Sequence, residues 1–346
     1  MIYFDNSATT KPNAAVLETY TKVASNYFAN PSSLHRFGAK SKELLDASRK
    51  QIAAMVSALP EEIIFTSGGT EGNNLAIKGL VYSYQNRGKH IVTSSIEHPS
   101  VRMVMEELEQ EGFTVTYLPV DKNGVIKMEA LKAALTDETI LVSIMGVNNE
   151  VGSIQPLHEI GEMLKLLEHT FFHVDFVQGI GKIPLALNEN AIDLLTFSGH
   201  KFHALRGTGI LFKRKNVHLH SEILGGGQEM GYRSGTENLA GNVALAKALR
   251  LTLENEPRKE ALIEIRDYLL TEIAQMSDMT VHTKQSVAAP SKQKLASSTL
   301  KAMGVTDEEA TGAVRVSLSY ENRLSEAKIF IQKLQEIIEN LNKVVK

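Results

Sequence analysis

The chain has 346 residues, of which 43% are hydrophobic and 22% charged, as is ordinary for a globular protein. Its 37 basic and 40 acidic side chains leave a net charge of −3, so no charge excess indicates binding to nucleic acid or an anionic membrane. No apolar run reaches the roughly 18 residues of a membrane span and residues 1–6 carry no basic leader, which predicts a cytoplasmic protein. There are no cysteines, which excludes disulfides, thiolate metal sites and a cysteine nucleophile in this chain.

The first part of the chain begins with a turn-rich segment and two helical patterns. Apolar spacing predicts a helix over residues 14–27, and residues 34–38 lead into a second helix that runs to about residue 59. The β-branched run 62–66 predicts a strand that enters the glycine-rich turn 67–74, where a further helix begins. A strand, a glycine-rich turn and a helix together direct backbone N–H groups at a phosphate, although a plain turn with Thr70 as the N-cap is the alternative.

Predicted strands and helices then alternate as far as residue 212, which favours a mainly parallel sheet with helices on both faces. Because ligand loops of such a sheet gather at the carboxyl ends of its strands, we expect the polar residues at those ends to form one site. The predicted strands are 90–94, 113–118, 139–144, 171–178, 192–197 and 209–212, and the strand-end residues are Gly69, Thr70, His98, Asn149, Asp175, Gln178, Ser198, His200 and Lys201.

Two of these residues indicate a particular chemistry. The run 171–178 is apolar on both sides of one carboxylate, Asp175, as in a buried parallel strand that delivers one charge to its carboxyl end, and Lys201 follows the next apolar run. A pyridoxal 5′-phosphate site needs this pair, because the lysine holds the aldehyde as a Schiff base and the carboxylate keeps the pyridine nitrogen protonated. A structural aspartate and a surface lysine are the alternative reading.

The C-terminal part changes in character. A second glycine-rich stretch, residues 225–238, precedes predicted helices over 239–256 and 259–276. We place a domain boundary near Pro257, with a large domain of residues 14–257 and a small domain formed by residues 1–13 and 258–346. Beyond the polar stretch 280–298 we expect a short helix at 299–303, a strand at 313–319 that presents Arg315 on one face, and a final helix over 325–345.

Taken in order, these motifs resemble the cysteine desulfurases, a group of class V aminotransferase-like enzymes with the fold type I pyridoxal phosphate architecture. The resemblance implies an α/β fold, with a large cofactor domain built on a mainly parallel sheet and a smaller α+β domain. It extends from residue 1 to about 280 and resumes from about 297. The motifs that carry it are residues 3–10, 30–35, 65–71, 97–98, 147–152, 173–178, 198–201, 233–236 and 309–318.

The resemblance also implies a role for each site residue. Lys201 would form the Schiff base and move the substrate α-proton, with His98 stacked on the ring and sharing in proton transfer. Arg315, with Asn149, would bind the substrate carboxylate, which suits the bidentate geometry of a guanidinium. The remaining roles are cofactor contacts: Asp175 at the pyridine nitrogen, Gln178 at the ring hydroxyl, Gly69, Thr70, Ser198 and His200 at the phosphate, and Thr236 at the phosphate of a partner subunit in a homodimer.

The chain departs from the family pattern where the nucleophilic cysteine should lie. Judged by the resemblance, roughly 35 to 45 residues of the small domain are missing near residues 280–297. Either Ala289 stands at the cysteine position, or the whole loop is absent and Lys284 lies near the junction. A natural deletion, an engineered or defective variant and an omitted segment are the three explanations.

We therefore expect a cysteine desulfurase-type protein whose intact relatives take sulfur from L-cysteine, giving L-alanine and an enzyme persulfide, for iron–sulfur clusters or thiolated tRNA. This chain should bind pyridoxal 5′-phosphate, L-cysteine or a similar amino acid, and a sulfur-acceptor protein, but should not form a persulfide. Other reactions of the same scaffold remain open, namely selenocysteine lysis or β-elimination from cysteine or serine. A catalytically inactive, cofactor-binding scaffold is the non-enzymatic alternative.

Overall fold

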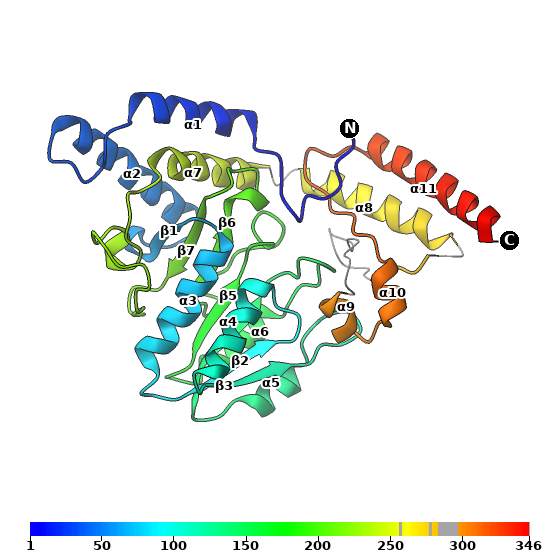
Figure 1. Cartoon of the computed structure of the whole chain (residues 1–346), viewed down its shortest axis with the longest axis horizontal. Coiled ribbons are helices and arrows are strands. Elements are labelled where there is room, and N and C mark those ends of the chain that lie inside the picture. Colours follow the sequence, from blue (N-terminus) through cyan, green and yellow to red (C-terminus); the bar gives the residue numbers. More distant parts are fainter. Residues whose placement is uncertain (256–257, 277–278, 283–296, 346) are drawn as a thin grey trace.

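A computed structural model describes residues 1–255, 258–276, 279–282 and 297–345 of the chain. Its centre is a seven-stranded sheet with the strand order β1-β7-β6-β5-β4-β2-β3, shown in Figure 1. Six strands run in the same direction, and β7 runs antiparallel to its two neighbours, β1 and β6. The strands are β1 (Ile63–Thr66), β2 (His90–Ser94), β3 (Thr114–Leu118), β4 (Thr139–Met145), β5 (Phe171–Asp175), β6 (Leu194–Ser198) and β7 (Gly209–Lys213).

Helices cover both faces of this sheet, so the predicted layered α/β fold is confirmed. One face packs against α1, α2, α6 and α7, and the other packs against α3 and α4. Alternation along β5 explains this, because Phe172 and Val174 join the first core while Phe171 packs against the second. The helices are α1 (Ala14–Asn26), α2 (Arg36–Met55), α3 (Gly69–Tyr84), α4 (Pro99–Gln110), α5 (Met128–Ala134), α6 (Leu157–Leu164) and α7 (Leu239–Glu254), with 3₁₀ turns η1 (Pro60–Glu62), η2 (Gly199–Lys201) and η3 (Glu229–Gly231).

Strand β7 has a glycine, Gly209, where it passes the glycine-rich turn at the start of α3. Gly209 pairs with Thr66 at the end of β1 and with Ser198 at the end of β6. A Cβ atom at Gly209 would lie 2.6 Å from the Cα of Gly68, closer than packed carbon atoms can approach. The glycine therefore lets the turn before α3 close over the sheet, which brings this turn beside the end of β6.

The C-terminal part contributes α8 (Lys259–Ala274), α9 (Ser298–Ala302), α10 (Asp307–Gly312) and α11 (Leu324–Val345). α8 and α11 lie side by side, and Ile265, Leu269, Leu318, Ala327 and Ile331 form a separate small core between them. Side chains of α9 and α10, in contrast, join the large core on the sheet. The domain boundary near Pro257 stays a prediction.

The expected strand at residues 313–319 is wrong for the described structure, which has only a single bridge there, between Asp5 and Ser317. The Ser317 N–H donates to the Phe4 carbonyl at 2.7 Å, and the Asn6 N–H donates to the Ser317 carbonyl at 3.3 Å. The alternating pattern is not enough for a strand, since a ladder needs a partner backbone along its length and the described residues offer one only here. The expected cysteine-loop positions, Lys284 and Ala289, lie outside the described residues.

Among the described helices, none is both long and apolar enough to cross a membrane.

Candidate active site

A cavity of about 440 Å³ opens at the edge of the sheet where strands β4, β5 and β6 end. We call it the cofactor pocket. Ten of the eleven predicted site residues line it, drawn from five loops and from the C-terminal part of the chain. They are Gly69, Thr70, His98, Asn149, Asp175, Gln178, Ser198, His200, Lys201 and Arg315. The expected convergence at the strand ends is therefore what the structure shows, whereas the individual roles stay predictions.

Asp175 is buried at the carboxyl end of β5 and is held by two hydrogen bonds. Its Oδ1 accepts from the Val177 N–H at 3.0 Å, and its Oδ2 accepts from Asn73 Nδ2 at 2.9 Å. The same Asn73 amide donates to Ser100 Oγ at 2.9 Å, and Ser100 Oγ lies 2.8 Å from His98 Nδ1. This chain of contacts fixes the carboxylate and the imidazole relative to each other.

Lys201 lies in the 3₁₀ turn η2, directly after β6. Its ammonium donates to two carbonyls of the N-terminal segment, those of Ser7 at 2.6 Å and Ala8 at 2.9 Å. Burial, followed by repulsion from Arg315, lowers the pKa of Lys201 to about 8, although Asp175 and Asp5 act in the opposite direction. A substantial fraction of the amine is therefore neutral near physiological pH, as a nucleophile toward an aldehyde must be.

The phosphate end of the pocket is built at the N-terminus of α3. The first N–H groups of a helix have no intrahelical acceptor, and those of α3 begin at Gly69. A Cβ at Gly69 would lie 2.8 Å from Val177 Cγ2 and 3.5 Å from Ser198 Cβ, so only glycine leaves this space open. Burial, then the charge of Lys201, lowers the pKa of His200 to about 4, so its imidazole is neutral here.

Arg315 reaches the pocket from the C-terminal part of the chain. It contacts the backbone of Asn149, the residue expected to bind the substrate carboxylate with it. Its Nη1 donates to the Asn149 carbonyl at 2.8 Å, and its Nη2 forms an ion pair with Asp5 Oδ1 at 3.0 Å. Its Nε is buried and has no hydrogen-bond partner among the described residues. The guanidinium therefore keeps an unused donor and can exchange its Asp5 contact for a ligand carboxylate.

His98 is the N-cap of α4, where its Nδ1 accepts from the Ser100 N–H at 3.1 Å. Burial lowers the pKa of His98, with a smaller opposing effect from Asp175, so the neutral imidazole is favoured. The preceding Glu97 is buried as well, and burial raises the pKa of its carboxyl to about 8. Glu97 accepts from Ser94 Oγ and the Met145 N–H, which joins the loop after β2 to the end of β4.

Other predicted residues lie away from the pocket or fill structural roles. Thr236 is exposed in the loop before α7 and does not line the pocket of its own chain. His173, on β5, is fully buried between Ser143 and Thr196, and burial lowers its pKa to about 3, so its neutral imidazole has a structural role. Within the described part of the chain, no group of His, Asp or Glu could hold a metal ion.

Sequence reasoning missed the residues that hold the predicted ones in place. Asn73 and Ser100 connect Asp175 to His98, and Ser7 accepts both from Lys201 and, at 2.9 Å, from Gln178 Nε2. Asp5 is the fourth, through its ion pair with Arg315. Asn73 could have been found from its position one helical turn after the glycine turn, whereas the others are set by contacts between distant parts of the chain.

The residues present fit pyridoxal 5′-phosphate. The cradle at Gly69 and the free N–H groups of α3 suit a phosphate, and the buried carboxylate of Asp175 suits a protonated ring nitrogen. The amine of Lys201, with a lowered pKa, lines the same pocket. Bound in this pocket, the cofactor would supply an electron sink for reactions at an amino acid.

Comparisons with known proteins agree with this geometry. Residues 2–311 match the aminotransferase class-V family. A NifS/IcsS protein homolog from Lactobacillus delbrueckii subsp. bulgaricus is 45% identical and aligns over 99% of both chains. The "putative cysteine desulfurase IscS 1" of Bacillus subtilis strain 168 is 47% identical over 259 residues, which cover 75% of this chain and 68% of that protein.

Solved structures show the same architecture. A NifS-like protein superposes with a TM-score of 0.93 at 35% identity, covering 98% of this chain and 99% of that one. The NifS-like protein from Rickettsia africae ESF-5 gives a TM-score of 0.86 at 31% identity, with the same coverage. The alignment with the Lactobacillus protein spans 380 positions against the 346 residues of this chain, so at least 34 of its positions have no counterpart here. With its sequence, fold and cofactor pocket in agreement, this chain belongs to the cysteine desulfurase group of the aminotransferase class-V family.

Proposed function

We propose that this chain binds pyridoxal 5′-phosphate and L-cysteine or a similar amino acid, and carries out the part of the desulfurase reaction that needs no thiol of its own. The observation that supports this most directly is the buried Asp175 beside the low-pKa Lys201 in one pocket, within a chain that contains no cysteine. A hydroxyl cannot replace the missing thiolate at neutral pH, so no enzyme persulfide is expected.

In this proposal each side chain of the pocket has one task. Arg315 binds the substrate carboxylate through its guanidinium, and Asn149 fixes that guanidinium from its backbone carbonyl. Lys201, as the free amine, takes the α-proton, and the neutral imidazole of His98 shares in the proton transfer. Gln178, which lines the same pocket, would hold the ring hydroxyl of the cofactor through its amide.

Incubation of the purified chain with pyridoxal 5′-phosphate, L-cysteine and a reductant tests the proposal. A visible absorbance band is expected on cofactor binding and should be absent from Lys201→Ala, while sulfide release should not be sustained. Sustained, stoichiometric release of sulfide and alanine would contradict the proposal. Persistence of the band in Lys201→Ala would refute the assigned role of that lysine.

A second candidate is β-elimination, which the absence of cysteine favours because elimination needs no thiol nucleophile. It uses the same proton transfer by Lys201 but ends in pyruvate and ammonia rather than alanine. Production of pyruvate from cysteine or serine, measured in the same assay, would select this reaction. Elimination from cysteine would release its sulfur as hydrogen sulfide, and elimination from serine would release water.

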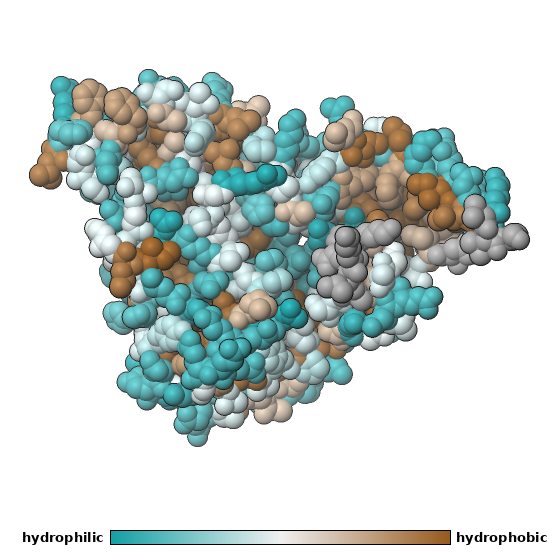
Figure 2. All heavy atoms as spheres, viewed as in Figure 1, coloured by the Kyte–Doolittle hydropathy of each residue, from teal (hydrophilic) through white to brown (hydrophobic). Residues whose placement is uncertain are grey.

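We further infer that the chain forms a homodimer and that Thr236 reaches the cofactor phosphate of the partner subunit. Exposed apolar side chains gather on the segment 17–37, where Phe28 is 80% and Phe37 64% exposed, and Figure 2 shows hydrophobic surface over this end of the molecule. Burial of such a surface stabilises subunit contacts. Light scattering should give twice the chain mass for the wild type and a monomer for the double variant Phe28→Glu, Phe37→Glu.

A further inference from the structure

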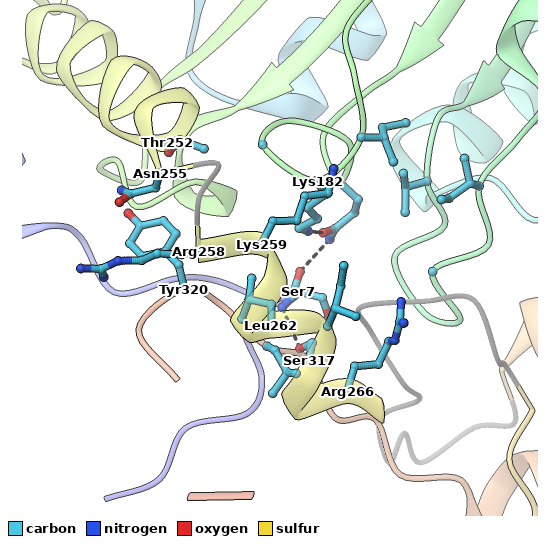
Figure 3. A pocket seen from close by; sticks show the side chains of 18 of the residues that line it. Ser7, Lys182, Thr252, Asn255, Arg258, Lys259, Leu262, Arg266, Ser317 and Tyr320 are labelled. Carbon is cyan, nitrogen blue, oxygen red and sulfur yellow. Dashed lines mark hydrogen bonds between the residues drawn. The ribbon is translucent and has the colours of Figure 1, made fainter. Parts of the chain in front are cut away.

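A second cavity, of about 350 Å³, lies next to the cofactor pocket and shares part of its wall. We call it the side cavity. Ser7, Val147 and Gln178 line both spaces. Helix α8 forms another wall, and Figure 3 shows Lys182 across from this helix. The volume falls in the range of small-molecule sites, so a small organic ligand fits the space.

The charged side chains that the structure describes around the side cavity all have one sign. Among the described residues, four cationic side chains and no acidic ones line it, the cations being Lys182, Arg258, Lys259 and Arg266. Figure 3 shows Arg258 and Arg266 at opposite ends of the α8 segment that faces the cavity. Among the described residues, only Arg266 of these four forms an ion pair, with the adjacent and exposed Asp267. A concave wall with one sign of charge concentrates its field and attracts anions.

Lys182 is the cation whose surroundings most need an anion. Its ammonium donates to Gln178 Oε1 at 2.7 Å, and no carboxylate of the described residues lies within ion-pair distance of it. A charge taken from water and paired only with a neutral amide is costly. Burial, with repulsion from Lys201 and Arg315, lowers the pKa of Lys182 to about 7. A ligand carboxylate beside the amine would supply the missing counter-charge.

The rest of the wall indicates the body of the ligand. It includes several aliphatic side chains, of which two are exposed, Ile154 at 45% and Ile263 at 39%. Val147, Ile183, Pro184, Leu262 and Leu318 add to this apolar surface. An anion with a short apolar chain would cover this surface, whereas a small inorganic anion would leave it in water.

We propose that the side cavity binds a small carboxylate with a short apolar chain, which pairs with Lys182 while its chain lies along α8. This ligand is distinct from the amino acid bound by Arg315 in the cofactor pocket. Lys182 holds Gln178, and Gln178 Nε2 donates to the same Ser7 carbonyl that accepts from Lys201. Occupancy of the side cavity therefore acts on the cofactor pocket through this chain of hydrogen bonds, a consequence that rests on the proposed function.

The test uses hexanoate as the probe, titrated into the cofactor-loaded chain and followed by calorimetry. Saturable binding is expected for the wild type, together with at least a tenfold loss of affinity in Lys182→Met, which keeps the apolar stem and removes the charge. Lys50→Met, an exposed lysine on α2, is the matched control and should bind as the wild type does. Equal affinity of wild type and Lys182→Met for hexanoate, or equal binding of the uncharged 1-hexanol, would overturn the proposal.

Two further variants keep the test decisive if Lys182→Met does not fold. Arg266 lines the side cavity and not the cofactor pocket, so the variant Arg266→Gln should weaken hexanoate binding severalfold. An unchanged affinity would count against the proposal. Loss of binding in Arg315→Gln with full binding in Arg266→Gln would place the anion in the cofactor pocket instead, which also overturns it. Failure of the chain to load the cofactor would contradict the proposed function alone, because hexanoate can still be titrated into the unloaded chain. A change in the visible band at saturation tests the link to Gln178.

Discussion

The substitution Arg315→Gln should slow the capture of pyridoxal 5′-phosphate by Lys201 at neutral pH. The pKa of Lys201 falls from 10.5 to about 8, first through burial and then through Arg315, while Asp175 and Asp5 oppose this effect. Loss of the guanidinium removes one cause of the lowered pKa. It also frees Asp5 from its ion pair at 3.0 Å and leaves that negative charge uncompensated. Both changes favour the ammonium, so the pKa of Lys201 should rise.

The size of the effect follows from the fraction of neutral amine. At pH 7, an amine with a pKa of about 8 is neutral in about 10% of molecules, against about 0.03% at a pKa of 10.5, which is roughly a 300-fold difference. A rise of about one pH unit in the pKa of Lys201 would therefore slow cofactor capture roughly tenfold at pH 7. At a pH well above both pKa values the two rates should converge, because the amine is then neutral in both proteins.

The assay is the growth of the visible band after rapid mixing of unloaded chain with cofactor, between pH 6 and pH 10. The wild-type rate should have its midpoint near pH 8. The midpoint for Arg315→Gln should lie higher, and Arg102→Gln, on the exposed side of α4, should match the wild type. A wild-type midpoint near 10.5, or an unchanged midpoint in Arg315→Gln, would refute the reasoning.

Three other predictions concern the cofactor turn and two buried carboxylates. Gly69→Ala places a Cβ 2.8 Å from Val177 Cγ2, so cofactor affinity should fall at least tenfold in a spectroscopic titration, with an unchanged helical circular dichroism spectrum. Burial raises the pKa of Glu97 from 4.5 to about 8, so its contribution to stability is complete below about pH 4.5 and is lost as the pH rises through 8. The melting temperature of the wild type should therefore fall relative to that of Glu97→Gln between pH 5 and pH 9. A constant difference between the two melting temperatures over this range would contradict the prediction. The side chain of Glu229 is 3% exposed and accepts two hydrogen bonds of 2.7 Å from Arg49. Glu229→Gln should therefore lower the free energy of unfolding, measured by urea titration, by about 3 kcal/mol. A loss of less than about 1 kcal/mol would contradict this prediction.

Much of the fold and of the pocket could be predicted because the information is local. The alternation of apolar runs predicts the layered sheet, and the strand-end residues predict where a site forms, since parallel strands present their carboxyl ends together. Asp175 and Lys201 are such residues, and both line the cofactor pocket. The strand predicted at residues 313–319 is wrong, because an alternating pattern indicates strand propensity but does not supply a partner strand.

The sequence by itself therefore determines the class of fold, the residues that gather at the sheet edge and the absence of a thiol, all of which depend on composition and short motifs. Only the tertiary structure decides which groups tune those residues. Asp5 meets Arg315 across 310 positions of the chain, and Ser7 meets Lys201 across 194. Lys182 gains its lowered pKa from a burial that no local pattern reveals. These contacts form only when distant segments pack together in the folded chain. The local sequence around a residue does not determine its distance from a residue hundreds of positions away.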